Sequence, residues 1–181
     1  VLIPARMAST RLPGKPLADI AGVPMIVQCL RRAEEAEVGP VVIACSEPEV
    51  AEAVEAAGGQ AVLTDPDLPS GSDRIFAALE VFDPEGKYDA IVNLQGDLPT
   101  LDPKVVRACV AVLDNPEVDI STAVCAITEE SERDNPNVVK AVMALSGNAR
   151  IGRALYFSRA TVPTGPGDHF HHIGLYAYRR D

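Results

Sequence analysis

The first apolar run of the chain leads directly into a loop that carries three cationic side chains. Residues 1–3 are Val-Leu-Ile, and the following loop contains Arg6, Arg11 and Lys15, with Gly14 directly before the lysine. Glycine lets the backbone approach an anion closely, and guanidinium and ammonium groups offset phosphate charge. The spacing therefore predicts a cradle for a nucleoside triphosphate. A proline-rich surface loop with scattered cations is the alternative for this stretch taken alone.

The loop differs from two common nucleotide-binding motifs. In the Walker A pattern, G-x-x-x-x-G-K-[ST], the first glycine would fall on Ser9 and the final hydroxyl residue on Pro16. The dinucleotide pattern G-x-G-x-x-G does not occur in the sequence. A P-loop NTPase and a Rossmann dehydrogenase are therefore both disfavoured.

A second candidate is Asp97, which follows Gln95 and Gly96 after the apolar run 90–94. Open parallel α/β sheets bind ligands at the carboxyl ends of their strands. A carboxylate there, beside flexible Gly96, can hold a hard cation against phosphate oxygens. Asp97 is therefore the predicted magnesium ligand, with a turn or helix-capping aspartate as the alternative.

The N-terminal loop resembles the signature of the sugar-activating cytidylyltransferases, and the chain is most similar to those that act on 3-deoxy-manno-octulosonate (Kdo). The similarity continues through five further ordered blocks along almost the whole chain. These blocks are Ser70-Gly71-Ser72-Asp73-Arg74, residues 93–99 (NLQGDLP), 135–140 (NPNVVK), 154–160 (ALYFSRA) and 172–178 (HIGLYAY).

The resemblance implies transfer of CMP from CTP to Kdo, with Mg²⁺ as cofactor, for lipopolysaccharide synthesis. It implies catalytic roles for Arg6, Lys15 and Asp97, with Asp97 as the metal ligand. The positions that match nucleotide-binding residues are Ala5, Arg6, Ser9, Arg11, Lys15, Ser70, Gly71 and Arg74. The positions that match sugar-binding residues are Gln95, Arg159, His172 and Tyr176. An arginine would face the sugar carboxylate, while amide, imidazole and phenol groups would contact hydroxyls.

Structural explanations stay open for several of these residues. Arg74 could also be a solvent-exposed charge on a helix. Tyr176 could be an aromatic side chain that faces inward from a strand, and Lys140 could be a charge at the edge of a strand. A general-base role for His172 is open as well, because metal coordination alone can acidify the attacking hydroxyl.

One feature of the family has no match here. Its members carry a second magnesium-binding aspartate and a dimer-forming region in a C-terminal segment, and no residues of this chain match that segment. The chain opens inside its first strand without a methionine and stops directly after another strand. We therefore expect a piece of a longer protein, with homodimer formation by the full-length protein.

The composition narrows the class of protein. A chain of 181 residues is long enough for one core, and a single domain is expected. Its net charge of −10 disfavours binding to nucleic acid or to anionic membranes. The apolar runs are strand-sized and no leading signal segment is present, which favours the cytoplasm.

The cysteines and histidines give weaker signals. Cys29, Cys45, Cys109 and Cys125 are widely spaced among apolar residues, so buried thiols are expected. The histidines cluster at 169, 171 and 172, but carboxylate or thiol partners at recognisable zinc spacing are missing. A substrate role for His172 is favoured over a zinc site.

Short apolar runs alternate with amphipathic stretches in the first part of the chain. This pattern predicts an α/β fold with a mostly parallel central sheet flanked by helices, as in Rossmann-like, GT-A-like nucleotidyltransferases. The expected strands are 1–3, 41–45, 61–63 and 90–94. The expected helices are 24–37, 47–57, a third that Ser72 caps after residues 70–71, and 103–113.

Beyond residue 118 the strands follow one another with few long helices between them. The expected strands are 120–127, 138–145, 154–157 and 173–178. This part is predicted to be mixed or antiparallel. Within one cytidylyltransferase domain, we expect residues 1–118 to be mainly the nucleotide-binding half and residues 119–181 mainly the sugar-binding part.

Two rival functions are open at this point. One is a cytidylyltransferase for another acidic sugar, such as 8-amino-Kdo or sialic acid, because the groups that contact hydroxyls are few and adaptable. The other is a non-catalytic CTP-binding module, suggested by the unmatched second carboxylate. Competition between sugars distinguishes the first rival, and binding of CTP without its breakdown distinguishes the second.

Overall fold

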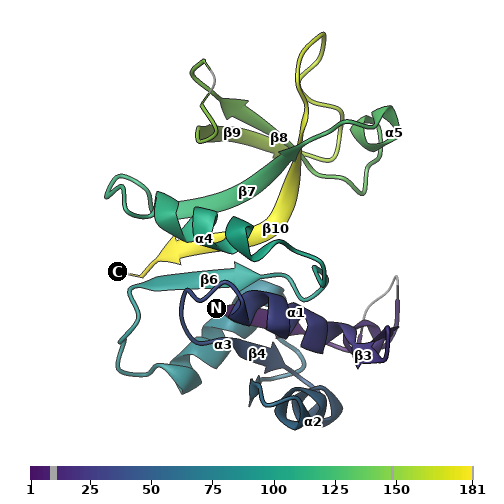
Figure 1. Cartoon of the computed structure of the whole chain (residues 1–181), viewed down its shortest axis with the longest axis vertical. Coiled ribbons are helices and arrows are strands. Elements are labelled where there is room, and N and C mark those ends of the chain that lie inside the picture. The colour runs from purple at the N-terminus through teal and green to yellow at the C-terminus, as the bar shows by residue number, and fades with distance from the viewer. Residues whose placement is uncertain (9–11, 148, 181) are drawn as a thin grey trace. The chain divides into compact units, whose positions relative to one another are not determined.

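The computed structural model describes residues 1–8, 12–147 and 149–180. It separates into two compact units (Figure 1). Unit 1 comprises Val1–Ser121 together with the C-terminal residues from Leu175, and unit 2 comprises Thr122–Gly174.

Unit 1 is built on a mostly parallel sheet, which confirms the predicted fold class. Its strands are β1 (Leu2–Ala5), β4 (Val42–Cys45), β5 (Gln60–Leu63) and β6 (Ala90–Leu94). They lie in the order β5-β4-β1-β6, and each neighbouring pair is parallel. Residues 175–179 of β10 (Phe170–Arg179) add an antiparallel partner to β6. The carboxyl ends of β1 and β6 therefore lie side by side.

Four helices accompany this sheet: α1 (Met25–Glu34), α2 (Pro48–Ala56), α3 (Gly71–Phe82) and α4 (Pro103–Val112). One face of the sheet packs on α3 through a buried cluster. The cluster consists of Leu2, Val42, Ala44, Ile75, Ala78 and Leu79. Side chains alternate along a strand, so Ile3 points to the face of the sheet opposite to Leu2 and α3. On that face, Ile3 and Ile26 of α1 both lie close to Gly96. Helices on both faces hold β1 and its following loop in place.

The segment between β1 and α1 contains short elements that the hydrophobic pattern did not predict. They are the 3₁₀ helix η1 (Lys15–Leu17) and the hairpin strands β2 (Asp19–Ile20) and β3 (Val23–Pro24). The helix predicted over 24–37 is correspondingly shorter. Pro24 pairs with Asp19 and precedes the helix, and Glu37 has a positive φ of 54° that an α-helix does not accommodate.

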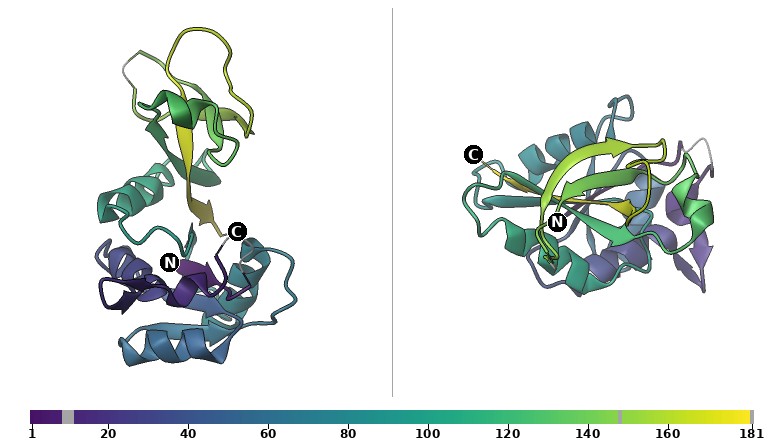
Figure 2. Two further views of the ribbon diagram at one scale, coloured as in Figure 1. Left: turned by 90° about the vertical axis from the view of Figure 1, so that its right-hand side faces the viewer. Right: turned by 90° about the horizontal axis from the view of Figure 1, so that it is seen from above.

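Unit 2 is antiparallel, as expected for this part of the chain. It contains the short helix α5 (Glu130–Arg133) and strands β8 (Lys140–Ala144) and β9 (Arg153–Ser158), with parts of β7 (Ile120–Ala126) and β10. β8 pairs antiparallel with β9 and with the start of β10. The connection between β9 and β10 forms a long loop that extends beyond the strands (Figure 2).

The cysteine prediction is correct for three of the four residues. Cys29, Cys45 and Cys109 are buried, and burial raises the pKa of each thiol to about 11. Cys125 is exposed instead, because it lies near the end of β7, where the side chains face solvent. Among the described helices, none is both long and apolar enough to cross a membrane.

Asp83 at the end of α3 joins distant parts of unit 1. Its carboxylate accepts hydrogen bonds from the Lys87 N–H (2.9 Å) and the Tyr88 N–H (3.1 Å). The Arg180 guanidinium donates to the same group at 2.6 Å. Burial alone would raise the pKa of the Asp83 carboxyl, but these hydrogen bonds and the Arg180 charge outweigh it and lower the pKa from 3.8.

We expect Asp83→Asn to lower the melting temperature at neutral pH, because the amide cannot neutralise the Arg180 guanidinium. A lowered pKa in the folded state means that this stabilisation is present above the unfolded pKa and is lost as the pH falls through the folded value. The gap between wild type and variant should therefore close below about pH 3.8. Thermal unfolding followed by circular dichroism across this range measures it.

Glu85→Gln is the matched control, because Glu85 pairs with Lys87 at 3.1 Å on the exposed surface. Exposed ion pairs contribute little to stability. A gap for Asp83→Asn that stays constant with pH would contradict the assigned role of the charge.

Candidate functional site

A polar pocket of about 270 Å³ lies in unit 1 at the carboxyl ends of β1 and β6. It gathers residues that are far apart in the sequence. Its lining consists of Pro4, Ala5, Arg6, Lys15, Pro16, Leu68, Ser70, Gly71, Arg74, Gln95, Gly96 and Asp97. Most of the predicted nucleotide-binding positions therefore meet the predicted metal ligand. Ser9 and Arg11 lie outside the described residues.

Opposite charges face each other in this pocket. Lys15 Nζ lies 2.6 Å from Asp97 Oδ2, and both side chains are partly exposed. Arg6 is exposed at the end of β1. An ammonium and a guanidinium thus line the same pocket as one carboxylate, an arrangement that can bind a polyanion together with a cation.

The backbone of the loop that follows β1 is held by two hydrogen bonds. The Met7 N–H donates to Glu47 Oε1 at 3.1 Å, and the Gly14 N–H donates to the Met7 carbonyl at 3.1 Å. Gly14 has a φ of 71°, in the left-handed region that favours glycine. The turn at Gly14 therefore sets the direction in which Lys15 enters the pocket.

Gly96 has a steric requirement of its own. A Cβ at this position would lie 2.8 Å from the Pro4 carbonyl oxygen, which is closer than real side chains approach. The loop after β6 thus passes directly against the end of β1. This close approach places the neighbouring Asp97 carboxylate within reach of Lys15.

Ser70 caps α3, whereas the sequence prediction assigned that role to Ser72. The Ser70 hydroxyl oxygen accepts a hydrogen bond from the Asp73 N–H at 3.2 Å, and the hydroxyl donates to the Asp73 carboxylate. The φ of −142° at Ser70 is the extended conformation of an N-cap, while residue 72 is already helical. The pocket wall around Ser70 is therefore held by the start of α3.

Arg74 lines the pocket but is only 2% exposed, so it is not a solvated helix charge. Its guanidinium donates to Thr64 Oγ1 (2.5 Å) and to the carbonyls of Asp65 (3.2 Å) and Pro66 (3.4 Å). These bonds fix the segment after β5 beside the pocket. Arg74 supports the wall in this structure, and direct contact with a nucleotide stays a prediction.

Gln95 and Tyr176 are half-buried and lie around the buried Asn93. Gln95 Nε2 donates to Asn93 Oδ1 at 3.3 Å, and Asn93 also hydrogen bonds with Tyr178. Tyr176 lies opposite Asn93 in the pairing of β10 with β6, and its ring stacks on Tyr178 with centroids 6.0 Å apart. Burial, followed by the influence of Tyr178, raises the pKa of the Tyr176 phenol.

Arg159 and His172 lie in unit 2. Arg159 Nη1 donates to the Pro136 carbonyl at 2.9 Å. His172 Nε2 lies 2.9 Å from Thr122 Oγ1, and the imidazole meets the Phe157 ring edge-on at 4.9 Å. Burial, followed by the nearby His171, lowers the pKa of His172 and favours the neutral imidazole.

The histidine cluster forms no metal site among the described residues, which contain no group of three potential His, Cys, Asp or Glu ligands. Both ring nitrogens of His169 instead lie near carbonyls, at 2.8 Å from Pro163 and 3.2 Å from Gly167. The carboxylate of Asp97 in the polar pocket is therefore the better candidate for a metal ligand.

Sequence reasoning did not identify Glu47 or Asn93. The sequence contains a signal for both: Glu47 is the second residue after an apolar strand, and Asn93 is a polar residue inside another apolar strand. Acidic residues at the carboxyl edge of a parallel sheet are candidates for positioning a ligand loop.

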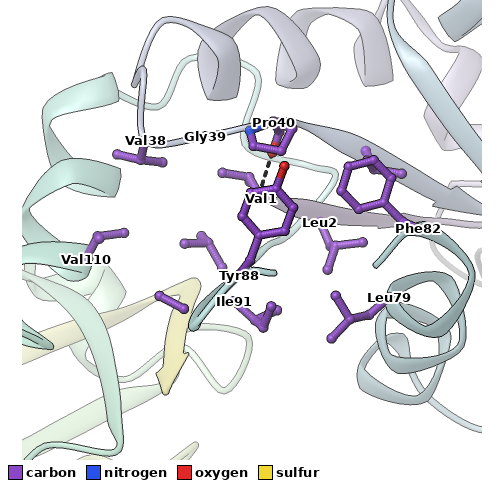
Figure 3. Close-up of a pocket in the computed structure, with 13 residues that line it drawn as sticks. Val1, Leu2, Val38, Gly39, Pro40, Leu79, Phe82, Tyr88, Ile91 and Val110 are labelled. Carbon is purple, nitrogen blue, oxygen red and sulfur yellow. Dashed lines mark hydrogen bonds between the residues drawn. The ribbon is translucent and has the colours of Figure 1, made fainter. Parts of the chain in front are cut away.

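A second hollow of about 50 Å³ lies in unit 1 (Figure 3). Its walls are apolar and include Leu79, Phe82 and Ile91, with the phenol of Tyr88 as the titratable side chain. No pair of opposite charges is present in this lining. The chemistry of unit 1 is therefore assigned to the polar pocket.

Comparison with known proteins gives a consistent result. The sequence profile of the family described as "Cytidylyltransferase" matches residues 1–180. The 3-deoxy-manno-octulosonate cytidylyltransferase of Rhodospirillum rubrum is 68% identical over 181 residues, which cover 99% of this chain and 72% of the relative. The protein of that name from Paramagnetospirillum magneticum is 66% identical, with coverage of 100% and 74%.

Solved structures agree. The structure of a CMP:2-keto-3-deoxy-manno-octonic acid synthetase complexed with CTP has a TM-score of 0.86 and 38% identity, covering 98% of this chain and 72% of that one. A putative glucose-1-phosphate thymidylyltransferase from Bacillus anthracis, at 15% identity and a TM-score of 0.59, shares the fold.

Proposed function

The chain belongs to the cytidylyltransferase family, and on this premise we propose that it transfers CMP from CTP to Kdo, giving CMP-Kdo and pyrophosphate. The observation that carries the proposal is the pocket at the carboxyl ends of β1 and β6, which is lined by Arg6 and by the Lys15–Asp97 pair. The identities of 68% and 66% to relatives named for this reaction support Kdo as the sugar.

The reaction is an in-line displacement at the α-phosphorus of CTP. The anomeric hydroxyl of the sugar forms the new P–O bond, and the bond to pyrophosphate breaks. Because charge is redistributed over phosphoryl oxygens, catalysis depends mainly on positioning and on charge neutralisation.

We assign the triphosphate to Arg6 and Lys15. Lys15 exchanges its Asp97 partner for phosphate oxygens when CTP binds, and Gly14 gives the loop its required turn. We also propose nucleotide-binding roles for Ala5, Ser9 and Arg11. Ser70, Gly71 and Arg74 form the wall assigned to cytosine and ribose.

Asp97 fits a divalent cation, and we propose Mg²⁺. Its carboxylate is a hard oxygen ligand, and its partner Lys15 is a cation that a metal ion can replace. The bound ion would neutralise phosphate charge and acidify the attacking hydroxyl.

We assign the sugar to Gln95, Arg159, His172 and Tyr176. The Arg159 guanidinium pairs with the sugar carboxylate, and amide, imidazole and phenol groups contact hydroxyls. The lowered pKa of His172 keeps its imidazole neutral, and a neutral imidazole can accept a proton from the anomeric hydroxyl.

The wider setting follows from this assignment. We propose that the CMP-Kdo made here is used in lipopolysaccharide synthesis, that the enzyme works in the cytoplasm and that the full-length protein is a homodimer. We also propose that residues 1–118 serve mainly the nucleotide and residues 119–181 mainly the sugar.

Pyrophosphate release tests the proposed function. The protein is incubated with CTP, Kdo and Mg²⁺, with ATP, UTP, 8-amino-Kdo and sialic acid as controls. Release that requires CTP and is fastest with Kdo supports the proposal. Faster release with another acidic sugar would transfer the assignment to that sugar, and binding of CTP without its breakdown would indicate the non-catalytic module.

A further inference from the structure

Lys140, the first residue of β8, is fully buried in unit 2, with an exposure of 0%. It is therefore not a strand-edge charge. Its Nζ donates hydrogen bonds to three backbone carbonyls, those of Asn135 (2.9 Å), Val138 (2.8 Å) and Arg159 (2.7 Å). The three N–H donors of the ammonium match these three acceptors.

The cage around Lys140 contains carbonyl dipoles in place of a carboxylate. None of the ion pairs between described residues includes Lys140. Burying a charge is unfavourable unless it is fully hydrogen bonded, so the positions of all three carbonyls matter. This lysine thus imposes a defined geometry on the backbone segments that surround it.

Two of those segments carry predicted functional blocks. Asn135 and Val138 belong to the turn before β8, where the Asn135 side chain also accepts the Asn137 N–H at 2.8 Å. The third carbonyl is that of Arg159, directly after β9. The Arg159 guanidinium returns to the same turn through the Pro136 carbonyl at 2.9 Å. Arg159 is therefore held at its main chain by Lys140 and at its side chain by the turn that Lys140 orders.

We propose that Lys140 is a positioning residue for the sugar: its ammonium fixes the backbone of Arg159 so that the guanidinium meets the sugar carboxylate. The inference rests on the proposed function, because it takes Arg159 as the group that pairs with this carboxylate. Lys140 itself does not touch the substrate. Its effect reaches the sugar through Arg159 alone.

The test compares Lys140→Met with wild type. Methionine keeps most of the apolar stem and removes the ammonium, so the Arg159 carbonyl loses its anchor. We expect the KM for Kdo to rise about 10-fold, the size expected when one charge-assisted hydrogen bond is weakened. The KM for CTP should change less than about twofold, because the assigned CTP residues lie in unit 1.

A double-mutant cycle with Arg159→Met separates positioning from general support of the fold. If Lys140 acts through Arg159, Lys140→Met should leave the KM for Kdo unchanged in the Arg159→Met background. Val138→Ala is the control, since it removes buried apolar volume from the same turn and leaves the lysine cage in place. It should lower the melting temperature without a selective rise in the KM for Kdo.

If Lys140→Met does not fold, Lys140→Gln replaces it, because the amide retains two N–H donors without the charge. Additive effects in the cycle, or equal rises in both KM values, would overturn the positioning role and leave the proposed function intact. If the wild-type protein turns over no acidic sugar, the proposed function and this inference both fail. If the wild-type protein prefers another acidic sugar, the KM values of the same double-mutant cycle are measured with that sugar.

Discussion

Asp97→Asn is expected to lower kcat for cytidylyl transfer by about 1,000-fold or more. The amide keeps the size of the side chain but has no negative charge with which to hold a hard cation. Loss of the cation removes a stabilisation of phosphoryl charge that is worth several kcal/mol, and about 4 kcal/mol corresponds to this factor. CTP binding should survive, because the change frees Lys15 from its 2.6 Å contact with Asp97 Oδ2.

Two measurements separate these effects: pyrophosphate release with saturating CTP, Kdo and Mg²⁺, and calorimetric titration with CTP. Asp102→Asn is the matched control. Asp102 lies in the same connection and caps α4 by accepting the Lys104 N–H at 2.9 Å, a role that asparagine also fills. If the Asp97→Asn variant turns over at the wild-type rate, Asp97 is not a ligand of the metal ion.

The sheet could be predicted because its strands carry a strong local signal. Apolar runs of strand length alternate with helical periodicity, and the predicted bounds 90–94 are those of β6. The position of Asp97 follows from this, since ligands of parallel sheets bind where strands end. The hairpin of β2 and β3 was missed because strands of two residues have no measurable periodicity.

The partners of buried cations could not be predicted in the same way. A surface charge was an open alternative for Arg74 and Lys140, yet the structure buries both and pairs them mainly with backbone carbonyls. Every residue has a carbonyl, so no sequence pattern marks the acceptors. In contrast, the sequence contained enough information to predict Ser70 rather than Ser72 as the N-cap of α3, because Ser70 and Asp73 have the spacing of a capping box.

Lys15→Met is expected to change nucleotide and metal binding in opposite directions. Methionine keeps most of the apolar stem and removes the charge, so CTP loses a charge-assisted contact and kcat/KM for CTP should fall about 100-fold. Asp97 simultaneously loses the ammonium that lies 2.6 Å from its carboxylate. A divalent cation no longer has to displace that ammonium, so the nucleotide-free protein should bind it more tightly than wild type does.

Calorimetric titration of the nucleotide-free protein with Mn²⁺, beside steady-state kinetics with CTP, measures both directions. Lys104→Met is the control, because Lys104 is an exposed lysine of α4 outside the pocket lining. It should change neither quantity. If Lys15→Met instead weakens metal and nucleotide binding together, the ion pair supports the site, and the exchange of partners proposed for Lys15 does not take place.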